Sequence, residues 1–343
     1  MSRSVLNRPA HCRTMLEGID GLNNGLDLQP QTITLNVRHV TIYRYARPVG
    51  LGPHRMMMRP RDGHDQRLIA AQLVIEPRPT RLRWLYDALD NCVAMASFSG
   101  STTELRVENR FTVERAEDDS PGGEIDPTAQ TYPFSYAPQE LPDIARSIER
   151  LYSDPSGELE RWARQFVVAG GTIPTSRMLM TMTYAIKESF IYERREEPGV
   201  QSPRWTLERR RGSCRDFAVL MMEAARALGF AARFVSGYLY VPRDDQGEDL
   251  RVGGGSTHAW CQVYLPGAGW VEFDPTNGLI GGRDLIRVAV ARDPAQAAPL
   301  AGTYSGSLDD ELGMEVAVKV TQHERRDNVL DEENGATREA IWK

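Results

Sequence analysis

The sequence lacks any apolar run of about 18 residues, the length that a membrane-spanning helix requires. Residues 1–31 also lack the apolar core of a signal peptide, and we interpret them as a disordered leader or a mis-assigned start, with a targeting or partner segment as the functional alternative. We therefore expect no membrane contact and a cytoplasmic location.

Cysteine is scarce as well, with four residues at positions 12, 92, 214 and 261. No two of them form a CxxC pair, so their spacing gives no zinc site, and we expect neither a metal nor a cofactor. Four cysteines in a chain of 343 residues do not indicate a disulfide framework, which fits a reducing compartment.

The chain has no excess of positive charge. Lys and Arg number 41 against 47 Asp and Glu, so the sequence offers no basic face of the kind that nucleic acids bind. Hydrophobic residues make up 41 % and charged residues 26 %, both close to the values of globular proteins. The length predicts two domains, or one domain with large additions.

Short alternating apolar runs in residues 32–115 predict an all-β, sandwich-like N-terminal domain, because each run is bounded by turn-forming residues. Prolines and glycines then interrupt residues 116–142. We interpret this stretch as a linker whose aromatic side chains, Tyr132, Phe134 and Tyr136, pack against one of the domains.

Residues 143–322 combine helical and strand patterns and predict an α+β catalytic domain. Leu179, Met182, Ile186 and Phe190 recur at the spacing of one helix face, and strand-like runs follow from residue 230. The charged residues 323–343 predict a frayed tail.

Cys214 stands where a helix should begin. An apolar stripe follows it at helical spacing, formed by Phe217, Leu220, Met221, Ala224 and Leu228, and Gly229 is placed to end the helix. The free N–H groups and the positive end of a helix dipole stabilise a thiolate, which is the nucleophilic form of cysteine. The alternative interpretation is a small buried side chain, which we assign to Cys92 and Cys261.

His258 is the one histidine predicted to lie in a strand of the same half of the chain as Cys214. A turn at residues 266–269 separates its strand from a second one that ends at Asp274. In such a hairpin, Asp274 can orient the imidazole while the other ring nitrogen faces the thiol. Taken singly, each residue has a structural alternative: His258 as a hydrogen-bonded histidine of a strand, and Asp274 as a turn-forming residue.

Several separated blocks, in this order, resemble the bacterial transglutaminase-like superfamily. They are residues 212–218, 236–238, 257–260 and 273–278, with a further likeness in Tyr192, Arg195 and residues 197–201, and in His39, Thr41, Tyr43, Asp90 and Asn91 of the front domain. The resemblance implies a papain-like core with a helix-borne cysteine against an antiparallel sheet, preceded by a β-rich domain. It also implies a triad of Cys214, His258 and Asp274 that forms a thioester.

The resemblance leaves the acyl acceptor open. We expect an amidase or protease that hydrolyses a peptide or isopeptide bond, with transfer of the acyl group to an amine as the alternative. A third possibility is a catalytically silent scaffold, whose mark would be a buried Cys214 without an open cleft. Animal transglutaminases use calcium, but no EF-hand-like acidic loop is present here.

Three aromatic residues, Trp205, Tyr238 and Trp260, are candidates for contact with the substrate, and core positions are the equal alternative. The expected partner is a peptide or protein substrate. The sequence does not determine the oligomeric state.

Overall fold

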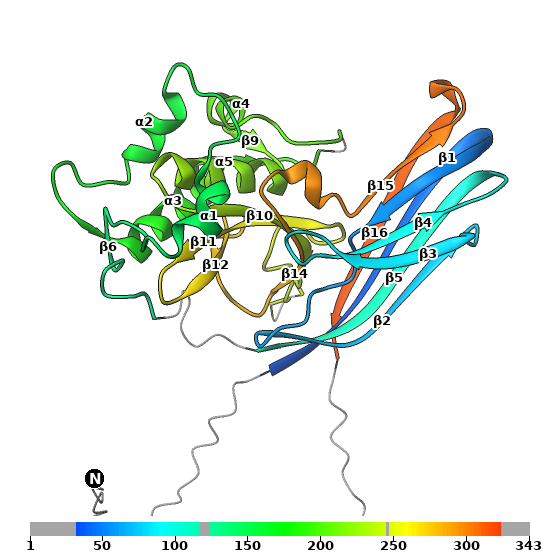
Figure 1. Cartoon of the computed structure of the whole chain (residues 1–343), viewed down its shortest axis with the longest axis horizontal. Coiled ribbons are helices and arrows are strands. Elements are labelled where there is room, and N and C mark those ends of the chain that lie inside the picture. Colours follow the sequence, from blue (N-terminus) through cyan, green and yellow to red (C-terminus); the bar gives the residue numbers. More distant parts are fainter. Residues whose placement is uncertain (1–31, 117–123, 196, 245–246, 324–343) are drawn as a thin grey trace, which may run out of the picture.

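The computed structural model describes residues 32–116, 124–195, 197–244 and 247–323, and the predicted leader and nearly all of the predicted tail lie outside these ranges. Two units are visible: a long, twisted sheet and a mixed unit of helices around a smaller sheet (Figure 1). The predicted α+β fold with a β-rich front domain is confirmed.

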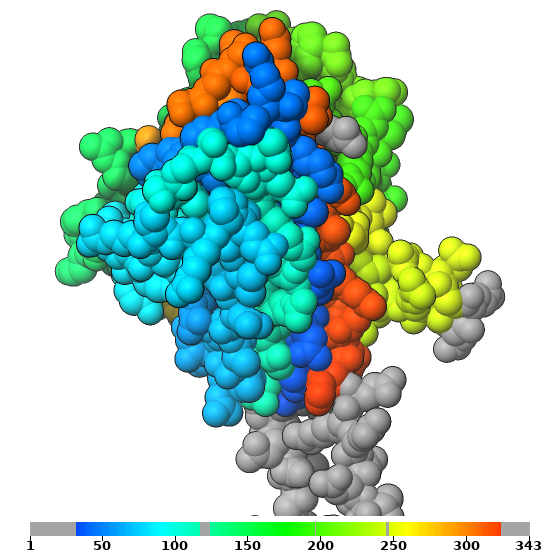
Figure 2. Space-filling model, turned by 90° about the vertical axis from the view of Figure 1, so that its right-hand side faces the viewer, coloured from blue at the N-terminus to red at the C-terminus, as the bar shows by residue number. Residues whose placement is uncertain are grey.

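The front sheet consists of seven strands that are hydrogen-bonded into one layer. They are β1 (Thr32–Met56), β2 (Gln66–Glu76), β3 (Arg81–Tyr86), β4 (Cys92–Ser97), β5 (Ser101–Ala116), β15 (Leu300–Ser305) and β16 (Glu311–Gln322). The 25-residue β1 is central, with β4 and β5 along one side and β15 and β16 along the other. Figure 2 looks onto this sheet and shows β1 and β16 side by side.

The two last strands join the front sheet across the chain. Residues 300–322, which the sequence analysis assigned to the catalytic domain, instead pair with β1, for example Val37 with Val320. Such pairing joins segments nearly 300 residues apart, and no local pattern specifies it. The front domain is therefore built from both ends of the described chain.

The second unit has a five-stranded antiparallel sheet in the order β13-β12-β11-β10-β14. Its strands are β10 (Ala232–Leu239), β11 (His258–Leu265), β12 (Gly269–Asp274), β13 (Leu279–Ile280) and β14 (Leu285–Ala291). Helix α5 (Cys214–Ala227) packs on β10 and β11. The predicted helix around residues 176–190 is α3 (Thr175–Ser189), and its face formed by Leu179, Met182 and Ile186 is fully buried.

The remaining elements are short. They are α1 (Leu141–Ile148), α2 (Glu158–Arg164), α4 (Pro203–Arg209), the 3-10 turns η1 (Pro294–Ala297) and η2 (Leu308–Asp310), and two strand pairs, β6 (Thr131–Tyr132) with β7 (Ile173–Pro174) and β8 (Ile191–Tyr192) with β9 (Arg211–Gly212). In the described ranges, no helix is long and apolar enough to cross a membrane.

The aromatic residues of the predicted linker dock on the second unit, as expected. Tyr132 stacks on Phe230 with ring centroids 5.4 Å apart. The Tyr136 hydroxyl donates to the carbonyl of Tyr264 and accepts from the backbone N–H of Ala231, each at 2.9 Å. The segment that follows the front sheet is therefore fixed to the second unit.

The two units share a buried interface. Its apolar part consists of Leu35, Val37, Phe111 and Val113 from the front sheet and Tyr238, Ile286 and Val288 from the second unit. Two side-chain amides of the front domain bind the free edge of β14. Gln66 bonds both backbone groups of Arg287 and Asn91 bonds both of Val290, at 2.8–2.9 Å. These amides satisfy an edge that would otherwise be open to another strand.

Candidate active site

Cys214 is the first residue of α5, as the sequence predicts. The apolar stripe behind it is buried in the main core, so burial of this face fixes where the helix lies. The backbone N–H groups of Cys214 and Arg215 find no acceptor among the described residues, since the first bonds of the helix run from Asp216 and Phe217 to the Ser213 carbonyl. The thiol therefore lies beside free donors at the positive end of the helix.

A carboxylate that the sequence analysis did not single out holds this helix start. Asp216 is fully buried, and its oxygens accept from the Ser213 backbone N–H and hydroxyl at 2.8 Å and from the Gln201 N–H at 2.7 Å. Arg195 lies 3.0 Å from the same carboxylate. The spacing Ser213–Asp216 is a capping-box signature and could have revealed this role.

His258 and Asp274 meet across neighbouring strands. The Nε2 atom of His258 lies 2.8 Å from Oδ2 of Asp274, and both side chains are inaccessible to solvent. The register pairs Cys261 with Phe273, which sets Asp274 diagonal to His258 and not directly opposite it. Because Nε2 is engaged by Asp274, Nδ1 is the nitrogen left for the thiol.

His258 and Asp274 shift each other's pKa. Burial alone would lower the pKa of His258, but the carboxylate of Asp274 and the thiol of Cys214 outweigh it and raise the pKa above its ordinary value. Burial would likewise raise the pKa of Asp274, but His258 lowers it, with help from hydrogen bonds of Asn277 and Thr276. The imidazolium–carboxylate pair is therefore the favoured form at neutral pH.

Asn277 is a second residue that sequence reasoning missed. Its Nδ2 donates to Oδ2 of Asp274 at 2.9 Å and to the carbonyl of Val252 at 3.1 Å, while its Oδ1 accepts from the Val252 N–H at 2.8 Å. Asn277 thereby ties the carboxylate to the glycine segment, residues 253–255. The signal for it is an amide three residues after Asp274, in the turn Asp-Pro-Thr-Asn-Gly.

The glycine segment covers the imidazole. A side-chain carbon at Gly253 would lie 3.1 Å from Nδ1 of His258, and the backbone φ of +100° there also favours glycine. Exposure is only 7 % for Cys214 and 1 % for His258. Three consecutive glycines before a strand signal such a close backbone approach in the sequence. The site is closed in this conformation.

We expect Gly253→Ala to slow alkylation of Cys214 by roughly 10- to 100-fold, because displacement of an acting group by even 1 Å is costly. The rate with iodoacetamide, resolved by peptide mass spectrometry, measures this. Gly255→Ala is the matched control: φ is +77°, and its new carbon would have no neighbour within 4 Å. Equal slowing in both variants would assign the effect to backbone strain alone.

The three predicted substrate-contact residues differ in their positions. Tyr238 is 1 % exposed and its hydroxyl bonds His39 at 2.8 Å in the domain interface, and its contact with substrate stays a prediction. Trp260 is fully buried and stacks on His258, with ring centroids 5.9 Å apart, so it packs behind the imidazole and does not line an open cleft. Trp205 is 44 % exposed on α4, beneath Arg209, and its contact with substrate stays a prediction.

The other cysteines lie where the sequence predicts. Cys261 is fully buried and Cys92 nearly so, and neither forms a disulfide, while Cys12 lies outside the described residues. Within the ranges that the structure covers, no group of three or more His, Cys, Asp or Glu side chains is arranged to hold a metal ion.

Two families match the two units. Residues 35–114 match the bacterial transglutaminase-like N-terminal region, and residues 160–275 match the transglutaminase-like superfamily. Together these matches span more than half of the chain, and the second contains Cys214, His258 and Asp274.

Relatives include an uncharacterised protein of Mycobacterium leprae, 39 % identical over 34 % of this chain and 39 % of that protein. An uncharacterised protein of Mycobacterium tuberculosis is 27 % identical over 82 % of this chain and 91 % of its own length. The protein-glutamine gamma-glutamyltransferase of Pseudomonas aeruginosa is 36 % identical over 20 % of this chain and 10 % of that protein. The matches thus cover less than two thirds of the length of the Mycobacterium leprae and Pseudomonas aeruginosa proteins.

A crystal structure from Cytophaga hutchinsonii, described as that of a candidate cysteine protease, has the same fold. Its TM-score is 0.61 at 18 % identity, and the match covers 90 % of this chain and 95 % of that one. The chain belongs to the transglutaminase-like superfamily and carries the bacterial transglutaminase-like N-terminal region in front of the core.

Proposed function

We propose that this chain is a cysteine amidase or protease that hydrolyses a peptide or isopeptide bond through a thioester on Cys214. The observation that carries this proposal is the placement of His258, whose Nε2 is held by Asp274 at 2.8 Å while Nδ1 is left for the thiol. This is the division of roles into nucleophile, base and orienting carboxylate that acyl transfer requires.

In the proposed reaction the thiolate of Cys214 attacks the carbonyl carbon of the substrate amide. The carbonyl oxygen becomes an oxyanion, and the free N–H groups of Cys214 and Arg215 are the donors available to it. His258 protonates the leaving amine, the C–N bond breaks, and a thioester remains. His258 then takes a proton from water, whose oxygen attacks the thioester, and the acid and the thiol are released.

Access to the imidazole requires movement of the segment that covers it. The glycine segment lies against Nδ1 of His258, and the contacts that hold it are the two Asn277 bonds to Val252 and a bond of 3.1 Å from the Val318 N–H to the Gly255 carbonyl. These are few bonds, and release of residues 252–256 would uncover the imidazole. We propose that substrate binding displaces this segment.

The test is labelling of the full chain with a thiol-reactive acyl probe. We expect label on Cys214 and none after Cys214→Ala. Cys92 is an internal control, because it is 9 % exposed against 7 % for Cys214, but burial raises the pKa of its thiol. Label on Cys92 and Cys214 at similar rates would reject an activated nucleophile.

Transfer to an amine is the second candidate, favoured by the local similarity to the Pseudomonas glutamyltransferase. Both reactions share the acyl-enzyme, so the acceptor decides between them. Once a cleaved peptide is known, a primary amine is added at increasing concentration. Hydrolysis predicts unchanged product and rate, whereas transfer predicts incorporation of the amine.

A catalytically silent scaffold is the third candidate. It is favoured by the burial of Cys214, because a buried Cys214 is the feature that we expect of such a scaffold. It predicts that neither the probe nor peptide substrates react, even when the protein is heated to just below its unfolding temperature. The cytoplasmic location stays a prediction, and the three described cysteines, all free, are consistent with it.

A further inference from the structure

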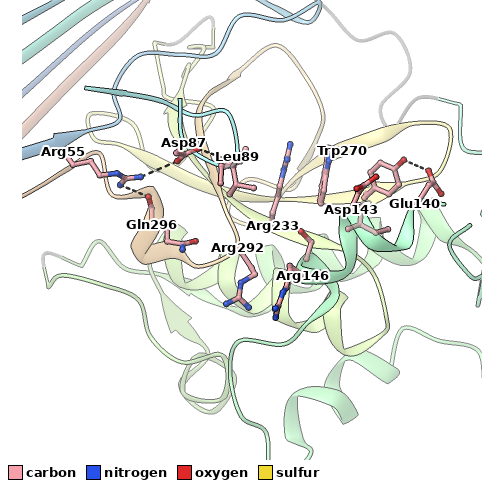
Figure 3. Close-up of a pocket in the computed structure, with 15 residues that line it drawn as sticks. Arg55, Asp87, Leu89, Glu140, Asp143, Arg146, Arg233, Trp270, Arg292 and Gln296 are labelled. Atoms are coloured by element: carbon pink, nitrogen blue, oxygen red, sulfur yellow. Dashed lines mark hydrogen bonds and ion pairs between the residues drawn. The ribbon is translucent and has the colours of Figure 1, made fainter. Parts of the chain in front are cut away.

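A cavity of about 810 Å³ lies where the front domain meets α1 and strands β10, β11, β12 and β14 of the second sheet (Figure 3). It is lined by the turn at residues 87–89 of the front domain, by Ile144 and Ser147 of α1, and by Tyr264 and Trp270 of the hairpin. None of the three triad residues lines it. Its volume is in the range of small-molecule sites.

One guanidinium in this cavity has no counter-ion. Arg233 of β10 donates from Nε to the Gln262 side chain at 2.8 Å, and its charged end lies 4.0 Å from the centroid of the Trp270 ring. Among the described residues no carboxylate forms an ion pair with it, and Glu272, which attracts it, is bound by Arg287 at 3.0 Å. Burial lowers the pKa of Arg233 to about 9, and repulsion from Arg287 adds to this.

The other basic side chains of the cavity are only partly balanced. Arg146 and Arg292 share one carboxylate, Glu149, at 2.9 and 3.8 Å. Arg55 is paired with Asp87 at 3.6 Å. Four arginines therefore have two acidic partners between them.

The two further acids of the lining do not face Arg233. Glu140 accepts from the Tyr264 hydroxyl, and Figure 3 shows it and Asp143 on the far side of Trp270 from Arg233. The cavity thus has a basic part around Arg233 and an acidic part at the start of α1, with the aromatic pair Tyr264 and Trp270 between them.

We propose that this cavity binds a small organic anion whose carboxylate or phosphate group is held by Arg233. A partly desolvated cation without a counter-ion is costly, and a bound anion removes that cost. The planar guanidinium suits oxyanions, which it can bind through two parallel hydrogen bonds. The apolar side chain of Leu89, 38 % exposed, and the half-buried rings of Tyr264 and Trp270 are available to the body of the ligand. This inference does not depend on the proposed reaction.

The test is thermal unfolding of the full chain with sodium succinate or inorganic phosphate, at constant ionic strength. We expect one of the two to raise the Tm by about 2–4 °C at saturation, and which one does so identifies the group. Arg233→Met should abolish this rise while its own Tm without ligand is no lower than that of wild type, because an uncompensated charge is lost.

Arg164→Met is the control, since Arg164 is an exposed arginine of α2, paired with Glu160 and outside the cavity. It should keep the full rise in Tm. Arg233→Lys, which keeps the charge but not the planar fork, should keep part of it. No rise in wild type with either anion, or an equal rise in Arg233→Met and wild type, would overturn the proposal.

Discussion

His258→Ala is expected to reduce the rate of acyl-probe labelling at Cys214 by about 10²- to 10⁴-fold, the usual contribution of a positioned acid–base group. The imidazole is held by the buried carboxylate of Asp274 and interacts with the Cys214 thiol, so its loss removes the base of the proposed triad. Asp274→Asn should also slow labelling strongly, because the amide lacks the negative charge that stabilises the imidazolium and its NH₂ group can face Nε2, which favours the wrong tautomer.

The matched control for this prediction is His54→Ala. His54 is a buried histidine too, 5 % exposed on β1, and its Nδ1 bonds the Gly52 carbonyl at 2.9 Å. It should leave the labelling rate within about twofold. If His258→Ala keeps the wild-type rate while the protein stays folded, Cys214 reacts without a base and the triad assignment is wrong.

Glu223→Ala is expected to destabilise the protein by about 3–5 kcal/mol, because it leaves a buried cation unpaired. Glu223 and Arg226 have fully buried side chains 2.7 Å apart on α5. The carboxylate of Glu223 also accepts the N–H groups of Leu151 and Tyr152, at 3.1 and 3.2 Å. Burial already lowers the pKa of Arg226, and Glu223 is the main group that opposes this shift.

Urea unfolding followed by circular dichroism measures the loss. Glu160→Ala is the control on α2: its pair with Arg164 has side chains 42 % and 61 % exposed, and removal of such a pair costs about 0–1 kcal/mol. A loss of less than about 1 kcal/mol for Glu223→Ala would show that water reaches Arg226. The double variant Glu223→Leu/Arg226→Met should recover much of the stability, since no charge is left unpaired.

The elements that carry the triad were predictable from the sequence because each has a local signal. The helix start at Cys214 is marked by Gly212, Ser213 and the apolar stripe that follows, and β11 begins at His258 as the alternation predicts. The turn at residues 266–269 implies that β12 returns beside β11. Because one face of each element is buried, its apolar residues recur at the spacing of a helix or a strand, and this spacing is visible in the sequence.

The positions of the aromatic residues were not predictable in the same way. Tyr238 and Trp260 are both strand residues beside the expected cleft, yet one lies in the domain interface and the other lies behind His258. A strand pattern shows which residues share a face, but not what covers that face. Tyr238, for example, is covered by His39 and Phe111 of the front sheet, which lie more than 120 positions earlier in the chain.

The sequence by itself determined which reactive groups are present: a thiol at a helix start, and a histidine and an aspartate on adjoining strands. It also determined that a β-rich region precedes them. Only the tertiary structure decided that β15 and β16 complete the front sheet, that Asn277 ties Asp274 to a glycine segment, and that this segment closes the site. The reason is physical. Helix starts and turns follow from bonds between near neighbours, whereas strand partners and covering segments depend on contacts between residues far apart in the chain.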